Sequence, residues 1–326
     1  MTMKLRGNIY EWLAEYFRRA PRRSFRRSSQ PLLIVGHRGS PTKAIENTFD
    51  SFVLALAEGA NALETDLVIT ADKQVLLWHD WHPNEYVALL RESGLEPFTL
   101  YKPYPPLQPY WRRPVHELTL AEFRHYFDYK RKRGHIAAGA TIPLLDDFLL
   151  WAKDQPRLRA IFLEIKIPRT QTTEAEEIFR QINDWWQKNH PHFTIYIESC
   201  PSELLDYGQK YFPSLNFTLS VESPIGIVLN PATYSAITPA ALAQRRCAVA
   251  VRPRRITIGS WTTYYRIIKK DLEFRENSSS NPIIKVTNIN KRSEIRALLA
   301  AGVDAIETDY PALVYELAQE MNLTIA

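Results

Sequence analysis

Acidic and imidazole side chains gather between residues 34 and 80. Glu64 and Asp66 are two residues apart, so on a strand both would point to the same face. Two carboxylates forced together repel each other unless a cation lies between them, and hard oxygen ligands at this spacing suit Mg²⁺, Ca²⁺ or Mn²⁺ rather than zinc. His37 and His79 are able to move protons near neutral pH. The pattern therefore predicts a divalent-metal site flanked by two acid–base groups.

A hairpin is expected to bring His79 to this site. The apolar run after Asp66 ends in a polar turn at residues 69–74, and a second apolar run follows at once at residues 75–78. The two runs must pair antiparallel, because a parallel return needs a crossover of a dozen or more residues. A turn centred near residues 72 and 73 then lays His79 opposite Asp66 to within one residue.

Repeated βα units are indicated from residue 32 onward, where apolar runs alternate with patterns of helical period. We expect barrel strands at residues 32–36, 61–66, 160–165, 194–198, 216–221, 247–251, 283–287 and 303–308. The run 75–78 is then the outer arm of the hairpin. These strands predict the α/β class and a (β/α)8 TIM barrel with an extra hairpin, with its chemistry at the carboxyl ends of the strands.

A long inserted segment follows the hairpin, from about residue 81 to residue 140. It is dense in Tyr, Trp, Pro and Arg around residues 101–113. A segment of this length in a compact domain is usually functional or disordered. We expect it to lie near the mouth of the barrel and to shape the substrate pocket, within a single catalytic domain of residues 32–326.

Charge separates an N-terminal arm, residues 1–31, from the rest of the chain. The arm holds eight Lys or Arg and two Glu, a net +6, whereas the whole chain carries +5. The basic pI therefore describes the arm and gives no reason to expect nucleic-acid binding. Apolar side chains recur at helical spacing over residues 5–17, which predicts an amphipathic helix. Such a helix suits either peripheral contact of residues 1–30 with an anionic bilayer or closure of the barrel bottom.

Several classes of protein are excluded by other patterns. Cys200 and Cys247 are the only cysteines and form no Cys-x-x-Cys pair, so neither a disulfide framework nor a structural zinc site is supported. There is no long apolar run of membrane-spanning length, and the N-terminus lacks the pattern of a signal peptide. These features favour the cytoplasm, with the inner membrane face as the alternative place for the arm.

Four short motifs, taken in order, give the chain a family resemblance. They are His-Arg-Gly at 37–39, Glu-Asn-Thr at 46–48, Glu-x-Asp at 64–66 and His-Asp at 79–80. This order resembles the signature of the glycerophosphodiester phosphodiesterase family, in the superfamily of phospholipase C-like phosphodiesterase barrels. Residues 161–166 and the closing run 301–311 also look like this family. The resemblance covers about residues 33–318 and is thin between 205 and 280.

The resemblance implies a role for each site residue. The implied residues are Glu64, Asp66 and Glu164 as metal ligands, His37 and His79 as catalytic groups, and Arg38, Lys166, Glu46, Asn47 and Lys285 as substrate or phosphate contacts. Lys285 stands where the family usually has an aromatic residue. If its side chain points up the barrel, it adds a cation near the phosphate. Otherwise the substitution puts the substrate selectivity of the family in question for this chain. Glu164 and Lys166 could instead form a surface ion pair. Asp309 is expected to cap the final helix.

The activity implied by the resemblance is metal-dependent hydrolysis of glycerophosphodiesters to glycerol 3-phosphate and an alcohol, in lipid and glycerol metabolism. One histidine would deprotonate the nucleophile and the other would protonate the leaving alkoxide, in an order that the sequence leaves open. The nucleophile is either water or the neighbouring glycerol hydroxyl of the substrate, which would give a cyclic phosphate first.

Two other functions compete with this one. The arm and the aromatic insertion favour a lysophospholipase D or phospholipase-type phosphodiesterase that acts on membrane lipids. A non-catalytic barrel that binds a lipid or a partner is the second alternative. Against it, every position at which the family expects a catalytic residue holds a residue of the expected chemistry.

Overall fold

The computed structural model describes residues 31–134, 137–168, 170–199, 202–221, 247–250, 268–269, 271–277 and 283–325. The predicted N-terminal amphipathic helix and the basic linker, residues 1–30, lie outside the described residues. The two interpretations of the arm therefore stay predictions.

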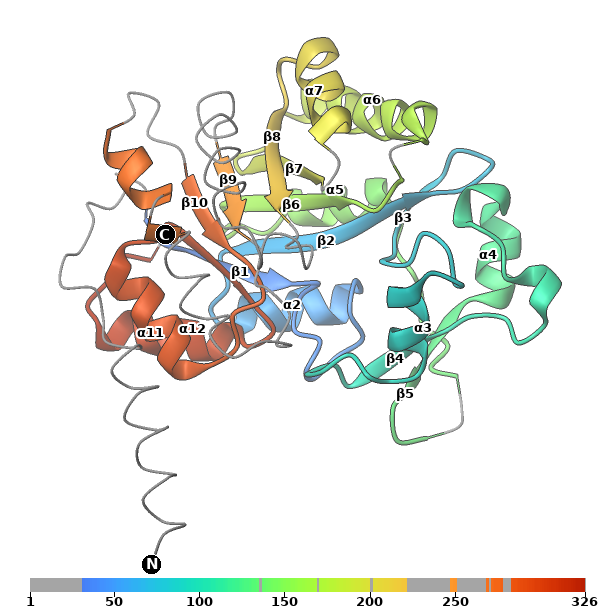
Figure 1. Ribbon diagram of the computed structural model, residues 1–326, viewed down its shortest axis with the longest axis horizontal. Coiled ribbons are helices and arrows are strands. Elements are labelled where there is room, and N and C mark those ends of the chain that lie inside the picture. Colours follow the sequence, from blue (N-terminus) through green and yellow to red (C-terminus); the bar gives the residue numbers. More distant parts are fainter. Residues whose placement is uncertain are drawn as a thin grey trace, which may run out of the picture.

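Eight parallel strands form the body of the fold and curve around a common interior (Figure 1). They are β1 (Leu33–His37), β2 (Ala62–Ile69), β6 (Ala160–Ile165), β7 (Thr194–Ser199), β8 (Asn216–Val221), β9 (Cys247–Ala250), β10 (Ile283–Val286) and β11 (Ala305–Thr308). Each strand pairs with its neighbour in this order, and β1 pairs with both β2 and β11, which closes the ring. The predicted TIM barrel and all of its expected strands are confirmed, with small shifts at the strand ends.

Helices cover the outside of the ring and alternate with the strands. Their bounds are α2 (Phe49–Ala57), α5 (Leu145–Lys153), α6 (Thr172–Asn189), α7 (Ser202–Tyr211), α11 (Arg292–Ala301) and α12 (Pro311–Glu320). In α6 the buried side chains recur every three or four residues, the spacing of one helix face. Outward-facing strand residues such as Leu63 and Leu163 pack in one cluster with Phe52 of α2 and Phe148 of α5. Burial of these apolar faces holds the helices on the barrel.

A separate set of side chains fills the lower barrel interior. Val35, Ala62, Phe162 and Tyr196, which come from four strands, form one buried cluster. The rings of Phe162 and Tyr196 stack with their centroids 4.9 Å apart. The interior below the strand ends is therefore a packed floor, as in other barrels of this size.

The predicted hairpin is present. Strand β3 (Val75–Leu77) runs antiparallel to β2, with Leu67 opposite Leu77. The backbone N–H of Trp78 donates to the carbonyl oxygen of Asp66 at 3.0 Å. His79 thus follows the residue opposite Asp66, which is the predicted register to within one residue.

The segment after the hairpin has structure of its own and lies beside the barrel, to the right in Figure 1. It contains α3 (Tyr86–Glu92), β4 (Tyr101–Tyr104), the 3₁₀ turns η1 (Pro109–Trp111) and η2 (Val115–Glu117), α4 (Leu120–Tyr126) and β5 (Asp128–Arg131). Strands β4 and β5 form a separate antiparallel pair. The backbone N–H of Leu100 donates a hydrogen bond of 2.9 Å to the carbonyl oxygen of Pro41, which connects the segment to the loop after β1.

Candidate active site

His37 is the last residue of β1 and faces Glu64 on the neighbouring strand. Its Nδ1 lies 2.6 Å from Oδ1 of Asp309, which follows β11. The expectation that Asp309 caps the last helix is wrong: α12 has Tyr310 at its N-cap and no side-chain cap. A carboxylate only accepts hydrogen bonds, so Asp309 fixes the proton of His37 on Nδ1 and leaves Nε2 for chemistry.

The turn after β1 places the next residues by its backbone conformation. Arg38 has φ 51° and Gly39 has φ 89°, both in the left-handed region. A Cβ on Gly39 would lie 2.4 Å from the Oγ of Ser51, so the turn requires glycine at that position. This turn directs the Arg38 backbone N–H at Glu64 Oε2, 2.9 Å away.

Glu64, Asp66 and Glu164 come together as predicted. Their ligand oxygens all lie within 4.8 Å of one another. Glu64 and Asp66 are 1% and 0% exposed, and Glu64 Oε1 has no hydrogen-bond partner among the described residues. Burial, followed by repulsion from Asp66 and Glu307, raises the pKa of Glu64 well above its usual range. A buried, repelling set of carboxylate oxygens with an unpartnered atom fits a hard divalent cation.

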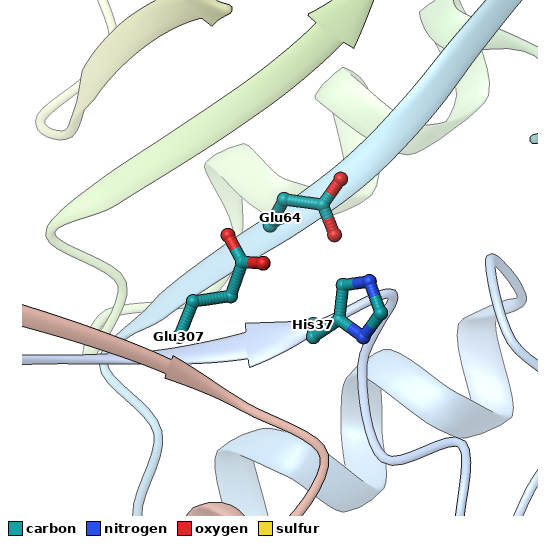
Figure 2. Close-up of side chains that lie close together, drawn as sticks. All are labelled: His37, Glu64 and Glu307. Carbon is teal, nitrogen blue, oxygen red and sulfur yellow. The ribbon is translucent and has the colours of Figure 1, made fainter. Parts of the chain in front are cut away.

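A second group shares Glu64 with the first. One ring nitrogen of His37 and one carboxylate oxygen each of Glu64 and Glu307 also lie within 4.8 Å of one another. Figure 2 shows these three side chains converging from strands β1, β2 and β11. Sequence reasoning missed Glu307, although it is an acidic residue near the carboxyl end of a predicted barrel strand, where site residues are expected.

Arg38 links the acidic cluster to the inserted segment. Its Nε lies 2.8 Å from Asp66 Oδ2, and its Nη1 donates to Glu46 Oε2 at 2.9 Å and to Glu96 Oε1 at 3.0 Å. Asn47 donates from Nδ2 to the same oxygen of Asp66 at 3.0 Å. The structure therefore brings Arg38, Glu46 and Asn47 to the site, where they orient Asp66 and one another.

His79 is held by a carboxylate, which an arginine holds in turn. Its Nδ1 lies 2.6 Å from Asp80 Oδ1, and Nε of Arg91, from α3, lies 3.0 Å from the same oxygen. Arg91 is 2% exposed and also pairs with Glu46 and Glu96. Sequence reasoning missed Arg91 and Glu96, which lie in a segment without a periodic pattern.

The two predicted lysines have different surroundings. Lys166 Nζ lies 2.5 Å from Glu164 Oε1 and 3.3 Å from Asp66 Oδ1, so it borders the carboxylate cluster. Lys285 is fully buried, and its Nζ lies 2.7 Å from Glu198 and 2.6 Å from Glu307. Lys285 does point up the barrel, but two carboxylates hold its ammonium group, so the prediction of direct phosphate contact does not fit this arrangement.

Comparison with known proteins agrees with this geometry. Residues 37–313 match the family model described as "Glycerophosphoryl diester phosphodiesterase family". The chain belongs to this family. YhdW of Bacillus subtilis (strain 168), a curated relative that carries the family's name, is 22% identical over 302 residues, which are 90% of this chain and 100% of that protein.

Solved structures of glycerophosphodiester phosphodiesterases share the fold. One from Silicibacter pomeroyi has 21% identity and a TM-score of 0.68, over 92% of this chain and 97% of that one. An Oleispira antarctica phosphodiesterase in complex with the product sn-glycerol-3-phosphate has 17% identity and a TM-score of 0.61, over 89% and 97% of the two chains. The predicted family, hydrolase class and phosphodiesterase activity are confirmed, so the non-catalytic alternative is set aside.

Among the described residues, no helix has the length and hydropathy needed to cross a membrane.

The two site histidines of this family member have opposite pKa shifts. Burial and Arg38 lower the pKa of His37, but Asp309 and Glu64 outweigh them and raise it from 6.5 to about 9. Burial, together with Arg38, Arg91 and Lys166, lowers the pKa of His79. At neutral pH, His37 is therefore protonated and His79 is neutral.

The raised pKa of His37 predicts a pH-dependent stability. In the presence of a chelator, the contact between His37 and Asp309 should add on the order of 3 kcal/mol to the free energy of unfolding of the wild type at low pH. Each unit of pKa shift corresponds to about 1.36 kcal/mol. The gain is complete below the unfolded-state value of 6.5 and is lost as the pH rises through about 9. Urea unfolding of wild type and Asp309→Asn from pH 5 to pH 10 measures it. A constant difference between the two proteins over that range would contradict the assignment.

Proposed function

We propose that the chain hydrolyses glycerophosphodiesters to glycerol 3-phosphate and an alcohol, with a divalent cation held by Glu64, Asp66 and Glu164. The observation that carries the proposal is the carboxylate cluster, two of whose three members are buried and whose oxygens lie within 4.8 Å of one another. Family membership supports the reaction, and the product bound to the Oleispira antarctica relative supports the substrate class. Mg²⁺, Ca²⁺ and Mn²⁺ all suit such oxygen ligands.

The cation would stabilise negative charge on the phosphate oxygens in the transition state. Arg38 and Lys166 border the cluster and are the residues we assign to the remaining phosphate oxygens. Glu46 and Asn47 are positioning residues in this proposal. Glu46 orients Arg38, and Asn47 orients Asp66. Charge-assisted hydrogen bonds of this kind also fix the geometry of a bound phosphodiester.

The opposite pKa shifts support an assignment that the sequence left open. His79, with a lowered pKa, is the general base that deprotonates water or the neighbouring glycerol hydroxyl. His37, with a pKa raised to about 9, is the general acid that protonates the leaving alkoxide. Two titratable groups driven apart by their surroundings are a common basis of such a division.

The test is turnover of glycerophosphocholine, glycerophosphoethanolamine, glycerophosphoglycerol and lysophosphatidylcholine, with each cation in turn. We expect metal-dependent release of glycerol 3-phosphate from the soluble diesters. His37→Ala and His79→Ala should each lower the rate on the order of 10²-fold or more, because each removes a proton-transfer group.

Outcomes of this panel separate the candidate functions. Near-normal turnover by both histidine variants would remove them from the mechanism. Cleavage of lysophosphatidylcholine without release of glycerol 3-phosphate from the soluble diesters would favour the lysophospholipase function. A variant without residues 1–30 would then show whether the arm contributes to turnover of that lipid. Equal folding of all variants, checked by circular dichroism, is the control.

A further inference from the structure

Glu307 lies among the catalytic groups but has no role in the mechanism above. It belongs to β11, and its carboxylate faces the same space as His37 and Glu64 (Figure 2). Its side chain is 5% exposed and that of His37 is 8% exposed, so both border the site to a similar extent. Glu307 is thus placed beside His37 and Glu64, where it can contact another part of the bound substrate.

A buried ion-pair chain holds Glu307 in this position. Lys285 Nζ lies 2.6 Å from Glu307 Oε2 and 2.7 Å from Glu198 Oε1. The same ammonium lies 4.1 Å from the centroid of the Phe162 ring in the barrel floor. Lys285 is 0% exposed, and a buried ammonium between two carboxylates fixes both of them in one geometry. Glu307 therefore presents its carboxylate to the site in a fixed position.

The spacing of the group fits a hydroxyl group. Hydrogen bonds to a hydroxyl oxygen are about 2.8 Å long, so one such oxygen can contact two atoms that are up to about 5 Å apart. The atoms of His37, Glu64 and Glu307 meet this limit, since all lie within 4.8 Å of one another. A hydroxyl has one proton to donate, and the carboxylate of Glu307 is a suitable acceptor for it. Lys285 already supplies a positive charge to Glu307, so this position needs no second cation.

We propose that Glu307 binds the glycerol moiety of the substrate, accepting a hydrogen bond from the hydroxyl on the carbon next to the esterified one. Lys285 and Glu198 are positioning residues that hold Glu307. This inference rests on the proposed function and deepens it, because it names the part of the substrate that the site recognises. Because Glu307 holds this hydroxyl on the His37 side, the group that His79 deprotonates is then water.

Binding of three phosphomonoesters tests the proposal without turnover. The probes are sn-glycerol 3-phosphate, 2-hydroxypropyl phosphate, which keeps the hydroxyl in question, and 3-hydroxypropyl phosphate, which lacks it. By calorimetry with Mg²⁺ present, wild type should bind the first two about ten- to a hundred-fold more tightly than the third, the usual effect of a hydrogen bond to a charged group. Glu307→Gln should lose most of this preference, and its affinity for 3-hydroxypropyl phosphate should hardly change.

Further variants keep the outcome decisive. Glu307→Asp retains the charge that Lys285 needs but withdraws the acceptor, so it should fold and lose the same preference. Glu316→Gln, on the exposed face of α12, is the matched control and should behave as wild type. An equal loss on all three probes, or a wild type without preference, would overturn the proposal. The proposal would also be overturned if the wild type bound two Mn²⁺ ions per chain and Glu307→Gln bound only one. His37, Glu64 and Glu307 would then form a cation site.

The inference and the proposed function can fail separately. If wild type shows the binding preference but releases no glycerol 3-phosphate from any diester, the proposed reaction is wrong and the hydroxyl contact stands. If it hydrolyses glycerophosphocholine but binds the three probes equally, the hydroxyl contact is wrong and the reaction stands.

Discussion

Replacing Glu64 by glutamine is expected to remove metal-dependent turnover while stabilising the metal-free protein. Glutamine keeps an oxygen that can accept from Arg38 N–H but removes the charge that a cation requires. The loss should be on the order of 10³-fold in kcat, because a bound cation contributes several kcal/mol of transition-state stabilisation. Stability should rise by about 1 kcal/mol, as is common when a strained functional group is neutralised.

The gain in stability follows from the surroundings of Glu64. Burial, Asp66 and Glu307 raise the pKa of this carboxyl, so the ionised form is penalised in the folded state at neutral pH. Ionisation of Glu64 therefore lowers the free energy of unfolding as the pH rises, which is the opposite of the effect of a carboxylate with a cationic partner. Glu64→Gln cannot ionise at this position, so it does not lose this stability. Thermal unfolding in chelator and kcat with added Mn²⁺ measure the two effects. A less stable Glu64→Gln that keeps metal-dependent activity would show that the cation is held elsewhere.

The barrel and two of the three clustered carboxylates could be predicted because they follow from local patterns. Apolar runs of strand length recur between helical patterns, and they reproduce every strand of the ring. The two-residue period of a strand places Glu64 and Asp66 on one face. The family resemblance added Glu164, and the structure aligns it with Asp66 in the parallel register of β2 and β6.

The charge states of the two histidines could not be predicted, because sequence neighbours mislead. His37 precedes Arg38, and His79 precedes Asp80, which locally suggests a lowered pKa for the first and a raised pKa for the second. The structure reverses this order. Asp309, 272 residues along the chain from His37, raises the pKa of His37, and burial with Arg38 and Arg91 lowers that of His79. Tertiary partners decide these values, and a single sequence does not pair them.

Arg91 was likewise missed from the sequence, and it couples the inserted segment to the surroundings of both site histidines. It pairs with Asp80, which holds His79, and with Glu46 and Glu96, which both hold Arg38. Tyr129 of β5 also donates to Glu46, at 3.2 Å. The insertion therefore supports the catalytic geometry as well as bordering the mouth of the barrel.

Arg91→Met is expected to destabilise the protein by about 3–5 kcal/mol, because it leaves Asp80 without its buried arginine and leaves Glu46 and Glu96 with Arg38 alone. The released Asp80 should no longer orient His79, so kcat should also fall on the order of tenfold or more in the fraction that stays folded. Urea unfolding and turnover measure both effects, with Arg91→Lys expected to lie between. Arg180→Met breaks an exposed ion pair with Glu177 on α6 and should cost less than about 1 kcal/mol, with unchanged kcat. If the two methionine variants were equally stable and active, Arg91 would have no part in positioning His79.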